Sequence, residues 1–343
     1  MQSKAKILLI YTGGTIGMSK DFETGALKAF DFSQLLQQVP ELQQLDCEVD
    51  SVSFEKPIDS SNMNPKIWGE LAAIIEDNYT KFDGFVVLHG SDTMSYTASA
   101  LSFMLENLTK PVILTGSQLP VGDLRTDAKE NLITAIQTAS LREKGKAVIQ
   151  EVCLYFEYKL YRGNRTTKVN AEHFQAFNSP NYPCLVESGV HLKWNKQLLW
   201  PVSEIGNDLK VQYLLDTNVL ILKLFPGISE TVLRSVFSIP SLKAVVLETY
   251  GAGNATTEKW FLKIIQTAVE KGVYVVNVTQ CSSGSVNMGQ YETSRELKLA
   301  GVISGKDITT EAAITKLMYL LGKNTAPKDF KTFFETSLRG EMI

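Results

Sequence analysis

Short apolar runs alternate along this chain with longer segments in which apolar residues recur at helical spacing. In the first half, the strand-like runs are residues 7–11, 85–88, 112–114 and 152–156, and the helical segments are residues 66–79, 93–108 and 126–141. Strands that are apolar at nearly every position are typical of a parallel sheet covered by helices on both faces. This half is therefore predicted to form an α/β domain.

The alternation fades over residues 178–216, which are polar and contain several prolines, and then resumes with shorter elements. These are predicted strands at 219–224, 244–247 and 273–278, and predicted helices at 230–236, 257–271 and 310–321. A chain of 343 residues also suits two domains better than one. We predict a larger N-terminal parallel-sheet α/β domain over residues 1–190, a linker over 191–212 and a smaller C-terminal α/β domain over 213–343.

Composition indicates a globular protein, with 44% hydrophobic and 21% charged residues. A formal net charge of −3 argues against nucleic acid or an anionic membrane as a partner. The first apolar run is shorter than the signal-peptide core of about 7–15 residues, and no run approaches the roughly 20 residues that span a bilayer. No C-x-x-C pair occurs among the four cysteines, Cys47, Cys153, Cys184 and Cys281. We therefore expect reduced thiols and a cytoplasmic location.

The first strand ends in a glycine turn, T-G-G-T-I-G at residues 12–17. Ligands of open α/β sheets bind just beyond the carboxyl ends of strands, so this turn is a candidate site. Its glycine spacing matches neither dinucleotide-binding nor P-loop motifs, which weakens a phosphate-binding interpretation. A structural turn, a phosphate-binding loop and a hydroxyl nucleophile supplied by one of its two threonines remain the alternatives.

A second polar segment, H-G-S-D at residues 89–92, follows the buried run 85–88 and precedes a helix. Ser91 or Asp92 would serve as a helix cap, which is the structural alternative to a functional role. His89 is interpreted as a packed or hydrogen-bonded structural histidine. The other two histidines, His173 and His191, lie far along the chain, and no metal-binding spacing is present.

Two further polar segments complete the candidate site. The basic stretch at residues 161–168 follows the run at 152–156, and a lysine beside Asp92, Lys168, would be able to take a proton from a hydroxyl or water. A solvated loop or an anion-binding loop is the alternative. The turn containing Asp59, Ser60 and Ser61 offers donors and acceptors for a small polar ligand, unless these are only turn and cap residues.

Hydroxyl, carboxylate and amine groups are thus predicted at one sheet edge, without a G-x-S-x-G motif, a phosphate loop or a metal-binding set. The chemistry left is acyl transfer on an amide or ester, in which a threonine or serine attacks and backbone N–H groups stabilise the oxyanion. We expect no cofactor and no metal.

Seven segments in order resemble the cytoplasmic (type I) bacterial L-asparaginases. They are T-G-G-T-I-G at 12–17, H-G-S-D-T-M at 89–94, T-G-S-Q-L-P at 115–120, R-G-N-R-T-T-K at 162–168, Y-G-A-G-N at 250–254, T-Q-C at 279–281 and L-R-G-E at 338–341. The resemblance implies two α/β domains and a homotetramer built from two intimate dimers. It also implies hydrolysis of L-asparagine to L-aspartate and ammonia through a threonine acyl-enzyme.

Carried over by motif, the resemblance implies Thr15 as nucleophile and Ser91, Asp92 and Lys168 as a triad that handles protons and orients water. Asp92 would also hold the substrate α-amino group, and the turn at residues 59–61 would bind the α-carboxylate.

Three departures from the family pattern qualify the resemblance. Ser91 stands where threonine is more usual, so its hydroxyl is expected to be positioned slightly less firmly. The family's lid tyrosine is missing; Phe22 or Phe30 would replace its packing, and a hydroxyl near Thr15 would have to come from elsewhere, such as Thr24. Thr279 and Cys281 match an allosteric asparagine site, but Glu248 occupies its arginine position. Since a carboxylate there repels the asparagine carboxylate, we predict weak or absent activation.

Other functions are also compatible with these motifs. A broader glutaminase/asparaginase and the amidase subunit of a tRNA-dependent amidotransferase share them; that subunit typically has an additional N-terminal domain. A non-catalytic α/β protein that binds a small ligand is expected to lack Thr15 or Lys168, and both are present.

Overall fold

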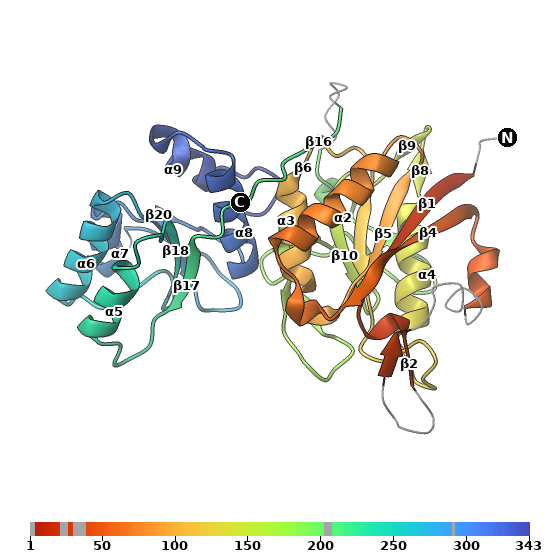
Figure 1. The fold of residues 1–343 in the computed structure, drawn as a ribbon, viewed down its shortest axis with the longest axis horizontal. Helices are drawn as coiled ribbons and strands as arrows, with labels where there is room; N and C mark the ends of the chain where they lie inside the picture. The colour runs from red at the N-terminus through yellow and green to blue at the C-terminus, as the bar shows by residue number, and fades with distance from the viewer. Residues whose placement is uncertain (1–3, 21–26, 30–38, 202–207, 290–291) are drawn as a thin grey trace. The chain divides into compact units, whose positions relative to one another are not determined.

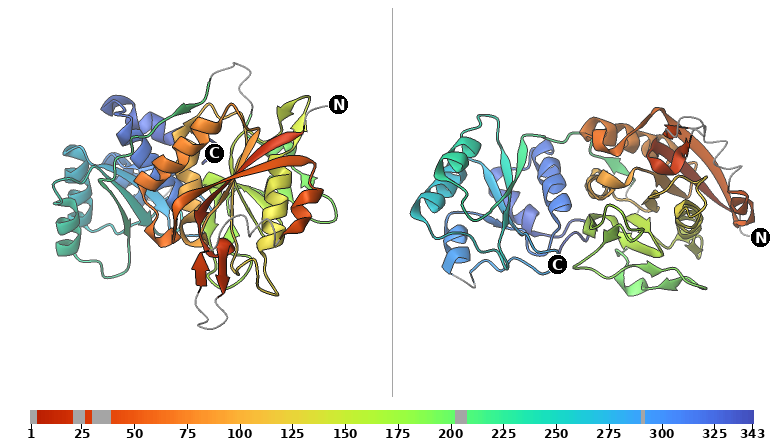
Figure 2. Two further views of the ribbon diagram at one scale, coloured as in Figure 1. Left: turned by 45° about the vertical axis from the view of Figure 1, so that its right-hand side comes forward. Right: turned by 90° about the horizontal axis from the view of Figure 1, so that it is seen from below.

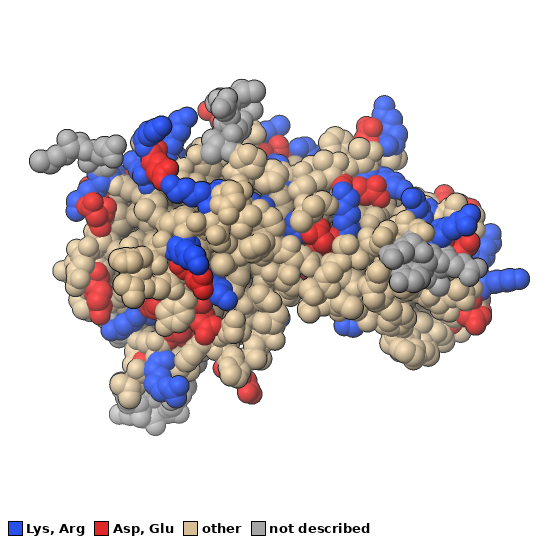
Figure 3. Space-filling model, turned by 180° about the vertical axis from the view of Figure 1, so that it is seen from behind, with Lys and Arg blue, Asp and Glu red and all other residues tan. Residues whose placement is uncertain are grey.

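The computed structural model describes residues 4–20, 27–29, 39–201, 208–289 and 292–343. The chain forms two compact units, Met1–Tyr213 and Leu214–Ile343. Both combine helices with a mainly parallel sheet, so the α/β prediction is confirmed. In the described part of the chain, no helix is long and apolar enough to cross a membrane. Figure 3 shows acidic and basic side chains interspersed over the face that it displays.

An eight-stranded sheet forms the centre of the first unit (Figure 1). In spatial order its strands are β15 (Lys193–Trp194), β14 (Val186–Glu187), β11 (Lys159–Arg162), β10 (Val152–Phe156), β7 (Val112–Thr115), β5 (Gly84–Leu88), β1 (Ala5–Gly13) and β4 (Cys47–Ile58). The five strands from β10 to β4 pair in parallel, and β11, β14 and β15 continue the sheet antiparallel. The four apolar runs predicted as strands are thus its adjacent central members.

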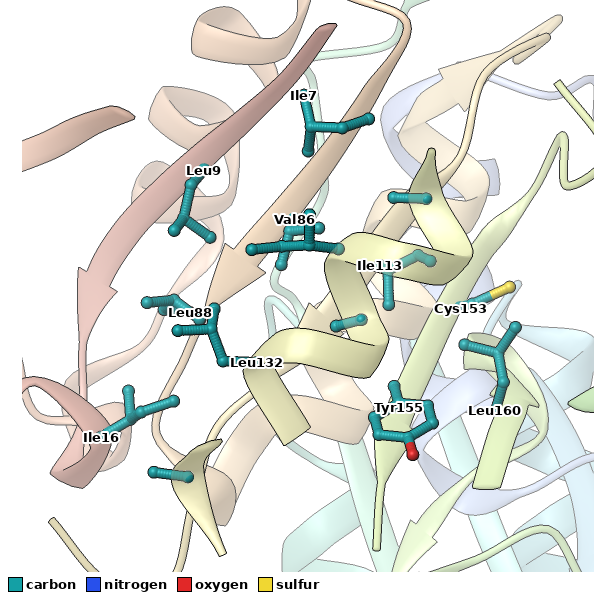
Figure 4. Packing of buried hydrophobic residues seen from close by; sticks show 14 of the residues in the cluster. Ile7, Leu9, Ile16, Val86, Leu88, Ile113, Leu132, Cys153, Tyr155 and Leu160 are labelled. Atoms are coloured by element: carbon teal, nitrogen blue, oxygen red, sulfur yellow. The ribbon is translucent and has the colours of Figure 1, made fainter. Parts of the chain in front are cut away.

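Helices cover this sheet on both faces, with α2 (Pro65–Asn78) and α4 (Ala128–Ala139) on opposite sides in Figure 2. Alternate strand residues point to opposite faces, so one set meets α4 and the other meets the second helical layer. Figure 4 shows the α4 side, where Leu132 packs near sheet residues that include Leu9, Val86 and Ile113. The core therefore lies directly beneath the strand ends that carry the polar segments.

Helix boundaries follow local signals in one case and tertiary pairing in another. α2 begins as predicted, because the Asn64 side chain accepts hydrogen bonds from the N–H groups of Lys66 and Ile67 and Pro65 occupies the first turn. α3 (Met94–Met104) ends earlier than the predicted residue 108. The chain turns there into β6 (Leu105–Glu106), which pairs with β16 (Lys210–Val211).

The remaining strands of the first unit are short. They form the antiparallel pairs β2 (Met18–Lys20) with β3 (Leu27–Ala29), β8 (Arg142–Glu143) with β9 (Lys146–Ala147), and β12 (Thr167–Lys168) with β13 (Phe177–Asn178). Single-turn helices are η1 (Thr15–Gly17), η2 (Pro40–Gln44), η3 (Ser60–Asn62), η4 (Ser91–Thr93), η5 (Gly163–Arg165) and η6 (Lys196–Leu198). The predicted linker, 191–212, includes β15 and β16, which pair with strands of this unit; its limits stay a prediction.

The second unit has a four-stranded parallel sheet in the order β17 (Val219–Lys223), β18 (Ala244–Thr249), β19 (Tyr274–Thr279) and β20 (Ile303–Ser304). Its helices are α5 (Glu230–Phe237), α6 (Lys259–Glu270), α7 (Glu292–Leu299), α8 (Thr310–Gly322) and α9 (Pro327–Glu335). The three predicted strands and three predicted helices are confirmed here. α7, α9 and β20 were not predicted.

Candidate active site

The polar segments that follow β1, β5 and β7 leave the sheet at one edge, whereas the basic segment 161–168 begins in the antiparallel strand β11 and leaves the sheet at its other end. In the parallel register Tyr11 of β1 lies beside Leu88 of β5, and Leu88 lies beside Thr115 of β7. Segments 12–17, 89–93 and 116–120 therefore emerge side by side at the carboxyl ends of neighbouring strands. This is the position at which open α/β sheets bind ligands.

Close packing brings the glycine turn at residues 12–17, the loop at 89–93 and the turn at 59–61 into contact. Gly14 has a φ of +87°, and a Cβ there would lie 2.5 Å from the Gly90 nitrogen. A Cβ on Gly90 would in turn lie 2.6 Å from the Ser60 Oγ atom. Glycine is required at both positions because any larger residue would force the loops apart. The turn that carries Thr15 therefore packs against the loop that precedes Ser91.

The two threonines of the glycine turn have different environments. Thr12 is buried, and its hydroxyl donates a hydrogen bond of 2.9 Å to the Leu88 carbonyl, which ties β1 to β5. Thr15 is half-buried and begins η1. Its hydroxyl forms no hydrogen bond with any other residue of the described ranges. Thr12 is thus part of the turn's own structure, whereas the Thr15 hydroxyl is available to a ligand.

Lys168, in the basic segment at residues 161–168, contacts the H-G-S-D segment at residues 89–92. Its Nζ donates to the Ser91 Oγ at 2.9 Å and to the Asp92 Oδ1 at 2.7 Å. β12 holds this lysine in register with Phe177 of β13, and its side chain is 17% exposed, whereas that of Asp92 is 64% exposed. A largely enclosed cation therefore faces a hydroxyl and an open carboxylate.

The capping alternative for this segment is wrong. Thr93 is the residue that precedes α3, and neither Ser91 nor Asp92 caps a helix with its side chain. Both side chains bond to Lys168 instead.

The turn at residues 59–61 is tied to the same region. Asp59 accepts hydrogen bonds from the Ser61 N–H and hydroxyl, which lower its pKa below the ordinary carboxylate value. Ser60 is buried, and its carbonyl accepts a hydrogen bond of 2.7 Å from the Thr93 hydroxyl. Asp59 thus stabilises the turn, which in turn lies against Gly90.

Gln118, for which no role was predicted, contacts Ser91 at the candidate site. The Ser91 hydroxyl donates to its Oε1 at 3.3 Å, and its Nε2 donates to the carbonyls of Ala171 and His173. Asp127 anchors the loop, because its carboxylate accepts from the Gln118 N–H. The signal was present in the T-G-S-Q-L-P segment, which follows a buried strand as the other site segments do.

His89 is fully buried and hydrogen-bonded, which confirms the structural interpretation. Its Nδ1 lies 2.6 Å from the Gly90 carbonyl oxygen, and its Nε2 lies 2.9 Å from the Thr97 hydroxyl. Burial lowers the pKa of this imidazole to about 4. His89 is therefore neutral at neutral pH.

The residues predicted for allosteric binding lie in the second unit, at the carboxyl ends of β18 and β19. Thr279 donates to the Gly251 carbonyl and accepts from the Cys281 N–H. The Glu248 carboxylate accepts a hydrogen bond of 2.6 Å from the Thr310 hydroxyl and lies 3.8 Å from the Lys223 ammonium. Glu248 already has partners within its own unit.

Phe22, Thr24 and Phe30, the residues predicted to compensate for the missing lid tyrosine, lie outside the described residues. The four cysteines are all free thiols.

A larger α/β unit in which a threonine-bearing glycine turn packs against the loop whose Ser91 and Asp92 bond to Lys168 fits the class of hydrolase that uses a hydroxyl nucleophile. Comparison with known proteins agrees. Residues 6–200 match the family model described as Asparaginase, N-terminal, and residues 218–334 match the Glutaminase/Asparaginase C-terminal domain. The chain therefore belongs to the asparaginase family, as its motifs predicted.

Individual relatives cover the whole chain. L-asparaginase 1 of Escherichia coli K12 is 44% identical over 344 residues, which cover 100% of this chain and 99% of the relative. The mouse 60 kDa lysophospholipase is 39% identical, over 100% of this chain and 63% of its own length. The crystal structure of L-asparaginase I from Vibrio cholerae matches with a TM-score of 0.90 at 42% identity, over 99% of both chains.

Proposed function

We propose that this protein hydrolyses L-asparagine to L-aspartate and ammonia, with Thr15 as the nucleophile. The observation that carries the proposal is the contact between the Thr15 turn and the Ser91 loop, whose Ser91 and Asp92 side chains bond to Lys168. The full-length similarity to L-asparaginase 1 of Escherichia coli supports the choice of substrate.

The reaction proceeds in two displacements. The Thr15 oxygen attacks the side-chain amide carbon, and N–H groups of the glycine turn stabilise the oxyanion. The C–N bond then breaks, and ammonia leaves with the proton that the Thr15 hydroxyl gave, through Ser91, to Lys168 in its neutral amine form. Water next attacks the aspartyl ester; one of its protons restores the Thr15 hydroxyl, and the other passes to the released ammonia as the aspartate carboxylate forms. No cofactor takes part in this scheme.

Substrate recognition uses the charged and polar groups around the nucleophile. The exposed Asp92 carboxylate pairs with the substrate α-ammonium group. Ser60 and Ser61 bind the α-carboxylate, and Asp59 holds their turn in place. The Ser61 hydroxyl points at Asp59 without substrate, so it must turn away from Asp59 to donate to the ligand.

Ammonia release from L-asparagine and from L-glutamine tests the proposal in wild type, Thr15→Ala and Thr15→Ser. We expect Thr15→Ala to lose at least about 10³-fold in kcat, since the acyl-enzyme cannot form, and Thr15→Ser to retain part of the activity. Circular dichroism checks that both variants stay folded. An unchanged rate in Thr15→Ala refutes the mechanism, and a higher kcat/KM for glutamine favours the broader glutaminase.

Three further features belong to this proposal. The free thiols support a reducing, cytoplasmic location. The protein assembles as a homotetramer of two intimate dimers, as the resemblance implies. Allosteric activation by asparagine is weak or absent, because the Glu248 carboxylate occupies the position of a cation and already binds Thr310.

A further inference from the structure

We propose that His89 is a positioning residue for catalysis: its imidazole fixes the Gly90–Ser91 peptide, and kcat depends on that hydrogen bond. The inference rests on the proposed function, because it concerns how the Ser91 and Asp92 side chains are held against Lys168. His89 itself is buried and does not touch the substrate.

A chain of three hydrogen bonds runs through the buried interior to this peptide. The Trp68 indole donates to the Thr97 oxygen at 2.9 Å, Thr97 lies 2.9 Å from the His89 Nε2, and the His89 Nδ1 lies 2.6 Å from the Gly90 carbonyl oxygen. All three side chains are buried. The chain joins α2 and α3 to the loop that follows β5.

The donor and acceptor groups of these residues determine which atom donates in each of the three hydrogen bonds. A carbonyl oxygen only accepts, so the His89 Nδ1 must carry a hydrogen. A neutral imidazole carries one ring hydrogen, so Nε2 must accept from the Thr97 hydroxyl. Thr97 is free to donate because Trp68, which can only donate, supplies a hydrogen to the Thr97 oxygen. The Gly90 carbonyl therefore selects the tautomer with the hydrogen on Nδ1, and Trp68 and Thr97 complement it by donating toward Nε2.

The target of this hydrogen bond needs external support. Gly90 has no side chain, and its backbone is conformationally freer than that of any other residue type. Gly14 and Ser60 restrict it sterically, since a Cβ on Gly14 would lie 2.5 Å from the Gly90 nitrogen. His89 adds a directed side-chain hydrogen bond to its carbonyl.

Fixing this carbonyl fixes the residues that follow. A trans peptide is a rigid plane, and the described backbone contains no cis bond. The orientation of the Gly90 carbonyl therefore sets the direction in which the chain enters η4. Ser91 and Asp92 are its next two residues, and both must meet Lys168 at distances below 3 Å. A displacement of about 1 Å at a catalytic group is sufficient to lower a rate by about 10²-fold.

Two substitutions at His89 separate the hydrogen bond from packing. In His89→Asn the side-chain N–H occupies the place of Nδ1 and still donates to Gly90. In His89→Gln the amide reaches the place of Nε2 and leaves the Gly90 carbonyl without a donor. We expect His89→Asn to keep kcat for L-asparagine within about tenfold of wild type and His89→Gln to lose about 10²-fold.

Thr97 provides a second test that leaves the imidazole in place. Thr97→Val is nearly isosteric but removes the hydroxyl that bonds to Nε2, so the imidazole loses the second of the two hydrogen bonds that orient it toward the Gly90 carbonyl. Thr97→Ser keeps the hydroxyl. We expect kcat to fall in Thr97→Val and to recover in Thr97→Ser, with Tm measured for every variant. A loss that follows Tm alone and does not distinguish the members of either pair overturns the inference.

Thr15→Ala in the same assay distinguishes the two proposals. An inactive Thr15→Ala with equal kcat in His89→Asn and His89→Gln, and in Thr97→Val and Thr97→Ser, overturns the role of His89 only. A fully active Thr15→Ala overturns both.

Discussion

Ser91 shows how much one side chain has to do at this site. Its hydroxyl donates to Gln118 and accepts from Lys168, so both directions of the hydroxyl are occupied by fixed partners. Threonine, which is more usual at this motif position, would keep both hydrogen bonds and add a methyl group that restricts χ1. The two hydrogen bonds therefore supply the restraint that serine lacks.

Substitution of Ser91 tests whether the hydroxyl handles protons. We expect Ser91→Ala to lower kcat by about 10²- to 10⁴-fold, which is the usual contribution of positioned proton transfer. Ser91→Thr is the matched control and should keep or slightly exceed wild-type kcat. Steady-state kinetics with L-asparagine measures both. If Ser91→Ala keeps more than a tenth of wild-type kcat, the hydroxyl has no such role.

At the scale of elements, α8 holds the end of the chain through an ion pair. Lys316 and Glu341 are both completely buried and form a salt bridge, and Lys316 also donates to the carbonyls of Phe334 and Thr336. Burial favours the neutral form of Glu341, but Lys316 and the N–H groups of Leu338 and Arg339 outweigh it and lower the pKa of this carboxylate overall.

This pair predicts a pH-dependent stability of the second unit. Because the pKa of Glu341 is lower in the folded state than its ordinary value of 4.5, its contribution is complete above that pH and is lost as the pH falls through the folded value. Glu341→Gln should cost about 3–5 kcal/mol at pH 7, since it leaves the buried Lys316 ammonium without a counter-charge. The difference from wild type should shrink below pH 4.5.

Hydrogen exchange of α8 amides at several pH values measures this stability locally. Glu230→Gln is the control, because its partner Arg234 forms an exposed pair on α5 and the expected cost is below about 1 kcal/mol. Equal effects of the two substitutions at pH 7 would contradict the assignment.

At the scale of the whole molecule, the proposed assembly and regulation are tested together. Light scattering should give four times the chain mass of 38.1 kDa. The rate of hydrolysis by the tetramer should rise hyperbolically with the concentration of L-asparagine, because Glu248 repels the carboxylate of a second asparagine molecule. Sigmoidal kinetics that Cys281→Ala abolishes would show that the allosteric site works despite Glu248.

Much of the architecture could be predicted from the amino-acid sequence. The continuous apolar runs predicted the central strands β10, β7, β5 and β1, and Asn64 and Pro65 predicted the start of α2. β4 was missed because its exposed and half-buried residues alternate at the edge of the sheet, and charged residues interrupt its apolar pattern. The early end of α3 was missed because β16, about a hundred residues later, pairs with the segment that follows it.

The candidate site divides in the same way. The motifs sufficed to predict the family, and the ends of β1 and β5 sufficed to predict that the glycine turn and the Ser91 and Asp92 segment share one sheet edge. Lys168 meets them for a reason that no strand end predicted, because β11 runs antiparallel to β10 and the chain returns to Ser91 and Asp92 only through β12. The Gln118 contact to Ser91 and the path from Trp68 through Thr97 to His89 appear only in the folded chain. Periodicity and capping are properties of neighbouring residues, which the sequence displays directly. Contacts between loops join residues that are tens of positions apart in the sequence and meet only when the sheet and its helices pack together. No local sequence pattern encodes which of these side chains then meet.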